Sequence, residues 1–251
     1  YQDIDGRRSP VTGRFTIEPA KDGAQVFGFE VAAYDRNSLL VIDPTITDSF
    51  YIGGAFNDFG NAMAFDATGD YVYVAGTTLS STFPGDGSTG VARSQTDVFV
   101  ARYATDGTAA LTQTILVGSA ADTCTALAVG TTGVYLTGST LSSDFPVTLP
   151  LFASLTGTKA DAYITKLSLS LGTKLFSTYY GGTGTESGNA RAVMQDSGVD
   201  AALYVAGTTD STDVPTRNAL YSKNNGGTDG FLLKLRPDGS LIHYATDFGG
   251  T

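Results

Sequence analysis

The sequence predicts an all-β fold built from a repeated four-stranded unit, and three observations support this prediction. The 251 residues include 31 glycines, 8 prolines, 13 tyrosines and 14 phenylalanines, a composition that favours strands and turns over helices. Short runs rich in Val, Tyr, Phe, Thr and Leu alternate with clusters of Gly, Asp, Ser and Pro, which is typical of strands joined by turns. These runs recur in one order three times, with Asp97, Asp161 and Asp229 at equivalent positions, which indicates internal structural repeats.

The segment ahead of the repeats does not follow their pattern. Its apolar runs predict three strands, at 15–18, 24–34 and 38–43. Residues 45–52 then look like the last strand of a repeat. We therefore expect an N-terminal β segment over 1–44, either the tail of a preceding β domain or an irregular copy of the repeated unit, followed by the repeats over 45–251.

Each repeat contributes four predicted strands, and the three repeats span about 53–117, 118–180 and 181–248. The first strands lie at 60–66, 124–129 and 188–194, and the second at 71–78, 134–140 and 203–209. The third strands lie at 97–103, 161–167 and 229–235, and the fourth at 111–117, 174–180 and 241–248. The long links between second and third strands share an apolar residue followed by proline, at Phe83-Pro84, Phe145-Pro146 and Val214-Pro215. Proline cannot donate to a strand ladder, so this step marks where the second strand has ended.

The third strand is apolar on both of its faces. In the first repeat Val98 and Val100 alternate with Phe99 and Ala101, so neither face is suited to water. Four-stranded antiparallel units that bury both faces against their neighbours are typical of a β-propeller. Because about four or more blades are needed to close a ring, three repeats need an irregular fourth blade from 15–52, a longer chain, or other chains.

Composition excludes several classes of protein. The net charge is −10, the wrong sign for binding nucleic acid or an anionic membrane surface. The apolar runs are far too short for membrane insertion, and the start at Tyr1 without a leader suggests a processed or excised piece. The single Cys124 cannot form an internal disulfide, and there is no Cys and His cluster for zinc.

Several motifs resemble the bacterial SBBP family of β-propeller repeats. They are Tyr51-Ile-Gly-Gly54, Asn61-Ala-Met-Ala-Phe-Asp66, Tyr73-Val-Ala-Gly-Thr77, Asp97-Val-Phe-Val-Ala-Arg102 and Ser177-Thr-Tyr-Tyr-Gly-Gly182. The resemblance covers residues 45–251, whereas 28–36 and 40–44 resemble the tail of an uncharacterised β-rich domain that often precedes such repeats. The resemblance implies a secreted or surface-exposed prokaryotic protein, usually larger than this chain, from a family to which no general enzymatic activity is assigned.

Three acidic residues, Asp58, Asp122 and Glu186, recur in the links between repeats, four positions after Gly54, Gly118 and Gly182. Such carboxylates on one end of a propeller could form a ring that holds Ca²⁺ or a cationic ligand, because hard cations prefer several oxygens. The alternative, which we favour, is that each carboxylate accepts backbone N–H hydrogen bonds and caps its own turn.

The other repeated polar residues are interpreted as structural. Asp97, Asp161 and Asp229 open the third strands and are expected to cap turns. Arg102, Lys166 and Lys234 follow five residues later on the opposite strand face, where a role between blades or in solvent is expected. The tyrosines of the second strands, Tyr73, Tyr135 and Tyr204, are expected to pack in the core.

The sequence therefore favours a non-catalytic extracellular or cell-surface scaffold for adhesion, interaction or assembly. Its partner is expected to be a protein or carbohydrate surface or further copies of itself, with no cofactor. The alternative is a part of a secreted propeller enzyme, a polysaccharide lyase or glycosidase that uses the carboxylates at the mouth of the channel.

Overall fold

The computed structural model describes residues 1–4, 6–19, 25–41, 51–81, 83, 95–106, 112–189, 193–195 and 202–250. These residues form 17 strands and no helix, so the all-β prediction is confirmed. Within these ranges no helix could therefore act as a membrane span. The chain divides into two compact units, Tyr1–Phe50 and Tyr51–Thr251.

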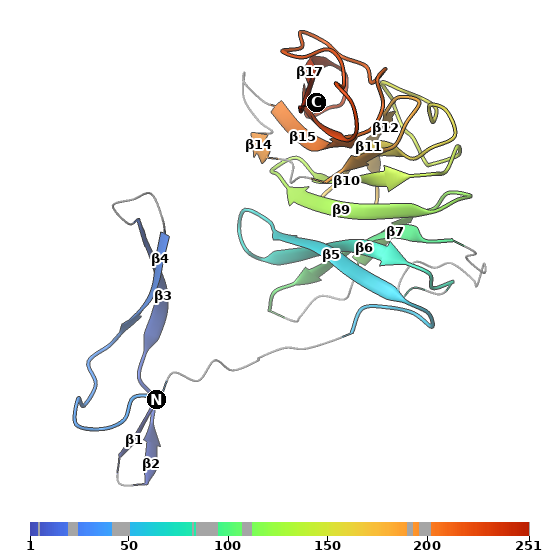
Figure 1. The fold of residues 1–251 in the computed structure, drawn as a ribbon. Coiled ribbons are helices and arrows are strands. Elements are labelled where there is room, and N and C mark those ends of the chain that lie inside the picture. Colours follow the sequence, from blue (N-terminus) through green and yellow to red (C-terminus); the bar gives the residue numbers. More distant parts are fainter. Residues whose placement is uncertain are drawn as a thin grey trace. The chain divides into compact units, whose positions relative to one another are not determined.

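The described part of the first unit contains two hairpins (Figure 1). Their strands are β1 (Gln2–Ile4), β2 (Arg7–Ser9), β3 (Gly13–Pro19) and β4 (Gln25–Val31). The predicted strand at 38–43 is wrong over 38–41, where only Leu40 forms an isolated bridge, to Gln2. Just before this run, the side chain of Gln2 donates to the backbone carbonyls of Asp35 and Ser38, and Ser38 N–H donates to Asp35 O, so residues 35–38 form a turn. Residues 42–50, and with them most of the strand predicted at 45–52, lie outside the described residues.

The second unit contains three antiparallel sheets, each with its strands in chain order. Sheet I consists of β5 (Asp58–Phe65), β6 (Tyr71–Thr78), β7 (Asp97–Ala104) and β8 (Thr112–Leu116). Sheet II consists of β9 (Asp122–Val129), β10 (Val134–Thr140), β11 (Asp161–Leu167) and β12 (Lys174–Tyr180). Sheet III consists of β13 (Glu186–Gly188), β14 (Val193–Gln195), β15 (Ala202–Thr209), β16 (Asp229–Leu235) and β17 (Ile242–Phe248). In sheet III, β13 and β14 both pair with β15 and together stand in the place of the first strand. The predicted four-strand repeat is thus confirmed; in the described ranges no sheet closes on itself.

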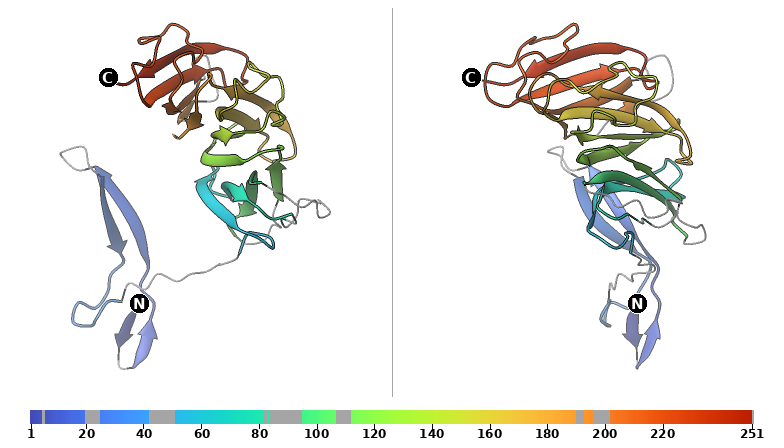
Figure 2. Two further views of the ribbon diagram at one scale, coloured as in Figure 1. Left: turned by 45° about the vertical axis from the view of Figure 1, so that its right-hand side comes forward. Right: turned by 90° about the vertical axis from the view of Figure 1, so that its right-hand side faces the viewer.

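The three sheets are stacked in chain order, so that sheet II packs against sheet I on one face and against sheet III on the other (Figures 1 and 2). The face that a sheet turns toward the preceding repeat is called its leading face, and the opposite one its trailing face. In sheet I the trailing residues Val98 and Val100 join a cluster with sheet II, whereas Phe99 and Ala101 join a separate cluster on the leading face. All four are buried, which confirms that the third strand is apolar on both faces.

The apolar residue of each link closes the leading side of its own sheet. Phe145 packs in the cluster between sheets I and II, Val214 in the cluster between sheets II and III, and Phe83 on the leading face of sheet I. All three are nearly fully buried. The repeated apolar-Pro step therefore has a packing role that follows from hydrophobic burial.

The first and second strands of sheets I and II do not pair evenly. Their register shifts by one residue, between Gly60 and Ala62 in sheet I and opposite Gly138 in sheet II. This shift leaves Asn61 and Thr125 out of the cross-strand pairing, as in a β-bulge. Both side chains turn to the next sheet instead.

Candidate functional site

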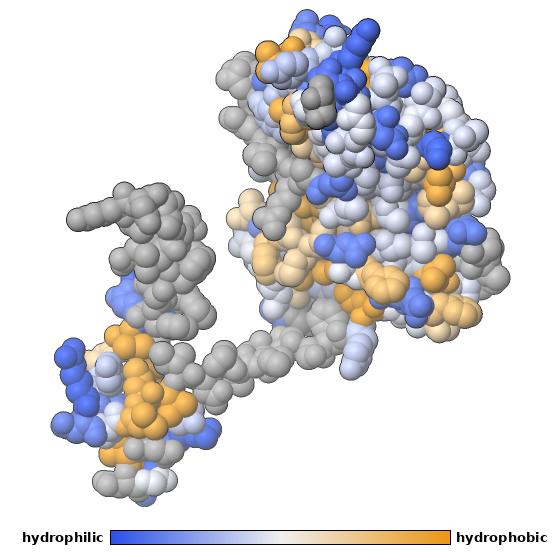
Figure 3. Space-filling view, viewed as in Figure 1, coloured by the Kyte–Doolittle hydropathy of each residue, from blue (hydrophilic) through white to orange (hydrophobic). Residues whose placement is uncertain are grey.

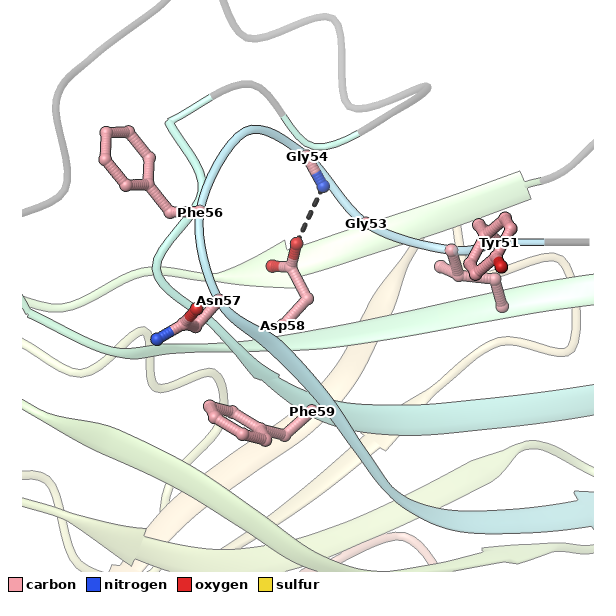
Figure 4. Close-up of a pocket in the computed structure, with 8 residues that line it drawn as sticks. Tyr51, Gly53, Gly54, Phe56, Asn57, Asp58 and Phe59 are labelled. Atoms are coloured by element: carbon pink, nitrogen blue, oxygen red, sulfur yellow. Dashed lines mark hydrogen bonds between the residues drawn. The ribbon is translucent and has the colours of Figure 1, made fainter.

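The repeated polar residues gather at the junctions between successive sheets. At the turn before the first strand of sheet I, Asp58 Oδ2 accepts a hydrogen bond from Gly54 N–H at 2.7 Å (Figure 4). In sheet III, Glu186 Oε2 accepts one from Gly182 N–H at 2.8 Å. The capping interpretation is therefore confirmed for Asp58 and Glu186. At Asp122 the geometry differs, because Gly118 N–H donates to Asp97 Oδ1 of the preceding sheet at 3.1 Å.

A serine from the end of the second strand completes each of these turns. Ser80 Oγ donates to Asp58 Oδ2 at 2.9 Å, and Ser142 Oγ donates to Asp122 Oδ2 at 3.0 Å. Ser211 Oγ donates to Glu186 Oε1 in the same way. Sequence reasoning missed these serines, although the spacing Thr-x-Ser recurs at 78–80, 140–142 and 209–211 and would have revealed them.

The backbone joins each turn to the sheet before it. Asp122 N–H donates to Thr96 O at 2.8 Å, and Glu186 N–H donates to Ala160 O at 2.7 Å. Both acceptors directly precede the third strand of the preceding sheet. The first strand of one sheet is therefore held to the third strand of the sheet before it at both junctions.

The residues skipped by the register shift form a second contact between sheets. Asn61 Nδ2 donates to Cys124 O at 2.8 Å, and the Thr125 hydroxyl donates to Gly188 O. Sequence reasoning did not identify this role, because it depends on which residue the strand pairing omits.

The basic side chains of the third strands form a third contact between sheets. Arg102 Nη1 and Tyr73 OH both donate to Leu169 O, at 3.1 and 2.8 Å. Lys166 Nζ donates to Pro237 O at 3.2 Å, with Tyr135 OH at 3.4 Å from the same oxygen. Leu169 and Pro237 lie in the turns after the third strands of the following sheets. The expected role between repeats thus holds for Arg102 and Lys166, which bond the next sheet. Tyr73 and Tyr135 are buried as expected, whereas Tyr204, also expected in the core, is only half-buried.

The acids that open the third strands also act as caps. Asp161 Oδ2 accepts Thr156 N–H at 2.9 Å, and Asp229 Oδ2 accepts Asn225 N–H at 3.0 Å. Asp161 lies beside Glu186 of the next sheet. An added methyl at Gly181 would stand 2.6 Å from Asp161 Oδ1 and 2.5 Å from Glu186 Oε2, so both carboxyls crowd this glycine.

Burial changes the protonation of two junction carboxyls. Burial, reinforced by the Glu186 carboxylate and opposed by the Thr156 N–H, raises the pKa of Asp161 to about 7. Burial also raises the pKa of Asp122 to about 6, against the hydrogen bond from Ser142. Both carboxyl groups therefore titrate near neutral pH, unlike an exposed aspartate, whose pKa is about 3.9.

We expect these two groups to make the protein less stable as the pH rises. Their pKa values are higher in the folded than in the unfolded chain, so their contribution is complete below about pH 4 and is lost as the pH rises through 6 to 7. Between pH 4 and pH 8, the free energy of unfolding of the Asp161→Asn variant should fall by about 1–3 kcal/mol less than that of the wild type. Urea unfolding at several pH values measures this difference.

The exposed Asp70→Asn variant is the control for removing one carboxylate. It should keep the wild-type dependence of stability on pH. An Asp161→Asn variant with the same dependence as the wild type would contradict the assignment of the proton to this junction.

The junction turn of sheet I differs from the other two because no preceding repeat of the described chain packs on it. A hollow of about 350 Å³ lies beside it, lined by residues from Tyr51 to Phe59. The side chains of Tyr51, Phe56 and Phe59 are exposed, and Figure 4 shows the three rings pointing in different directions around the turn. The rings therefore do not form one stacking surface.

The three candidate carboxylates are not brought together as metal ligands. In the described ranges no group of three or more His, Cys, Asp and Glu side chains is arranged to hold a metal ion. Asp58, Asp122 and Glu186 instead lie one per sheet, each in its own turn. Asp3, Ile4 and Gly6 belong to the β1–β2 hairpin, where Gly6 has a φ of 76°.

Comparison with known proteins informs only the first unit. A family model described as a domain of unknown function (DUF7948) matches residues 1–45. The match falls on the segment that resembles the tail of an uncharacterised β-rich domain. No curated protein matches the chain significantly.

Proposed function

We propose that residues 45–251 are SBBP-like repeats that form part of a β-propeller, with sheets I, II and III as three successive blades. The observation that carries this proposal is the repetition of one set of junction contacts. Three contacts to the neighbouring sheet occur at both junctions. They are made by a backbone N–H of the first strand, by the side chain that the strand pairing omits, and by a tyrosine together with a basic side chain. Because the contacts at the two junctions are equivalent, each sheet is related to the next by a similar rotation, as blades are around an axis.

We further propose that this chain is a non-catalytic scaffold of an extracellular or cell-surface protein. Its recurring carboxylates support this role, because Asp122, Asp161 and Glu186 are buried and hydrogen-bonded within the junctions. A polysaccharide chain in solution cannot reach groups buried in this way. Contacts with a protein or carbohydrate partner are expected through the links between second and third strands, which vary in length without changing the sheets.

A panel of neutral and anionic polysaccharides separates the scaffold from the alternative, a lyase or glycosidase. We expect the wild-type chain to release neither reducing ends nor unsaturated products. Retention of the labelled chain on an immobilised polysaccharide, without cleavage, would identify a carbohydrate partner. Cleavage by the wild type that disappears in the Asp58→Asn/Glu186→Gln double variant would overturn the scaffold proposal.

The double variant also carries a control for folding. Both substitutions keep an oxygen that can accept the glycine N–H hydrogen bonds, so the circular dichroism spectrum should match that of the wild type. Loss of cleavage in a variant that remains folded is then a loss of chemistry.

A further inference from the structure

A hollow of about 360 Å³ lies between sheets II and III. Three segments line it: Leu151 and Phe152 in the link of sheet II, residues 215–217 in the link of sheet III, and residues 240–242 at the turn into β17. The two sheets pack directly against each other, so the hollow belongs to a formed junction. On the side of the molecule shown in Figure 3, hydrophobic atoms over sheets II and III form small, separate patches. An apolar group of a partner would therefore be buried more completely in the hollow than on this surface.

Most of the lining is apolar and is held in place by the junction. Phe152 N–H donates to Thr178 Oγ1 at 2.8 Å, and the centroid of its ring lies 6.1 Å from that of Tyr180. Phe152 and Ile242 both pack against the cluster between the sheets. The volume falls at the lower end of the range for ligand pockets, about 300–1,000 Å³. Such a hollow suits an apolar side chain better than a sugar, whose hydroxyls would lack partners there.

Arg217 is the only charged residue among those that line the hollow. It is exposed, and within the described residues its guanidinium has no ion pair or hydrogen bond. Its backbone is fixed by two hydrogen bonds with Ala245, of 3.0 and 2.8 Å. In sheet II the equivalent residue, Thr148, makes the same two bonds with Ser177. The fold therefore requires the backbone at this position but not an arginine, which leaves the guanidinium free for a ligand.

The polar groups beside the arginine are suited to a ligand that accepts hydrogen bonds. The Thr216 hydroxyl has no partner in the described part of the chain, so it can donate to a ligand. Asp238 accepts hydrogen bonds from Ser240 N–H and Oγ, at 2.9 and 2.7 Å, so this acid is engaged in its own turn. An arginine binds a carboxylate well, because two guanidinium N–H groups match its two oxygens. The net charge of −10 repels a carboxylate at long range, but exposed charges are screened beyond about 8 Å at physiological salt, so the adjacent guanidinium dominates.

We propose that this hollow binds the carboxyl terminus of a partner protein whose last residue is apolar. This inference rests on the proposed scaffold function and names the chemistry of its partner. The last side chain would occupy the apolar hollow, and the terminal carboxylate would pair with Arg217 and accept from Thr216. Because Arg217 and Ser240 are exposed, the hollow opens to solvent, and the rest of the partner chain can leave through this opening.

Fluorescence anisotropy with the whole chain tests this inference at about 0.15 M salt. The probe is the peptide Gly-Ser-Gly-Ser-Phe, labelled at its amino terminus and carrying a free carboxyl terminus. We expect saturable binding of this peptide. The same peptide with an amidated end, and a peptide that ends in serine with a free carboxylate, should each bind at least about tenfold more weakly. The first has lost the charge, and the second has lost the buried ring.

The Arg217→Gln variant should weaken binding of the free-carboxyl peptide at least about tenfold and leave binding of the amidated peptide unchanged. Such non-additivity requires that the guanidinium and the carboxylate contact each other, which a general effect on the fold would not produce. The side chain is exposed and makes no contact that holds the fold, so the midpoint of urea unfolding should equal that of the wild type. The Arg236→Gln variant is the matched control, since it removes the same charge from an exposed residue that does not line the hollow. It should bind the peptide like the wild type.

Several results would overturn the inference. One is a wild-type chain that does not bind the free-carboxyl peptide at concentrations up to about 1 mM. Equal affinity for the free and amidated peptides would exclude recognition of the carboxylate, and equal losses in the two arginine variants would indicate a general attraction to positive charge. Binding of N-acetylphenylalanine as tight as that of the peptide would assign the hollow to a small acid instead of a protein terminus.

The polysaccharide panel separates failure of this inference from failure of the scaffold proposal. A chain that binds no peptide and cleaves nothing leaves the scaffold proposal standing and removes only this partner. Cleavage of a polysaccharide would overturn the scaffold proposal whatever the peptide does.

Discussion

Replacing Gly138 with alanine is expected to lower the free energy of unfolding by more than about 3 kcal/mol. Gly138 lies on β10 where the register shift brings β9 unusually close. A Cβ atom at this position would stand 1.9 Å from Thr123 O and 2.8 Å from Thr123 C. Both are backbone atoms, which cannot turn away as a side chain would, so the two strands would have to separate. The midpoint of urea unfolding, followed by tyrosine fluorescence, measures this loss.

Gly172→Ala is the control for adding a methyl group to a glycine. Gly172 is exposed, and the nearest atom to its added methyl, Ser170 Oγ, lies 3.7 Å away, an ordinary contact distance. This variant should stay within about 0.5 kcal/mol of the wild type. Equal unfolding midpoints for the two variants would show that the close strand approach at Gly138 is wrong.

Replacing Phe145 with alanine is expected to cost about 3–5 kcal/mol. Its ring is 2% exposed and lies between sheets I and II, with its centroid 4.5 Å from that of Tyr163 and 6.2 Å from that of Tyr179. Removing the ring opens a cavity, and Tyr179 cannot move into it without breaking the hydrogen bond from its hydroxyl to Ser142 O at 2.7 Å. Thermal and urea unfolding both report this loss.

Two further variants calibrate the result. Phe145→Leu keeps most of the buried volume and should lose less stability than Phe145→Ala. Phe56→Ala removes the same ring from a position that is 66% exposed, so its effect should be small. A Phe145→Ala protein as stable as Phe56→Ala would mean that the link does not close the space between the sheets.

The sheets of the second unit were predictable because their signals are local. Alternating apolar residues such as Val98 and Phe99 predict a strand with two buried faces, and glycine and proline mark its ends. Because the same signals occur three times at similar spacing, each predicted strand is supported by its counterparts in the other two repeats. In the first unit no repetition was available, and the apolar run at 38–41 was predicted as a strand although it makes only an isolated bridge, between Leu40 and Gln2.

The junction contacts were not predictable in the same way. Asn61 and Thr125 acquire their role because the pairing of β5 with β6 and of β9 with β10 omits them, and a register shift has no signal in one strand alone. The acceptors Leu169 O and Pro237 O are backbone atoms, to which residue type gives no clue. The raised pKa of Asp161 likewise depends on Glu186 of another sheet, a relation that becomes visible only once the sheets are stacked.

The junctions rely on backbone oxygens as acceptors, and this has a consequence for the history of the gene. Leu169 and Pro237 are different residues, yet the carbonyl of each accepts hydrogen bonds from a tyrosine hydroxyl and a basic side chain. Mutation can therefore change the acceptor residue freely while its partner bond persists. Duplicating or deleting one whole module would leave compatible neighbours on both sides, so arrays of different length can arise without new contacts having to evolve.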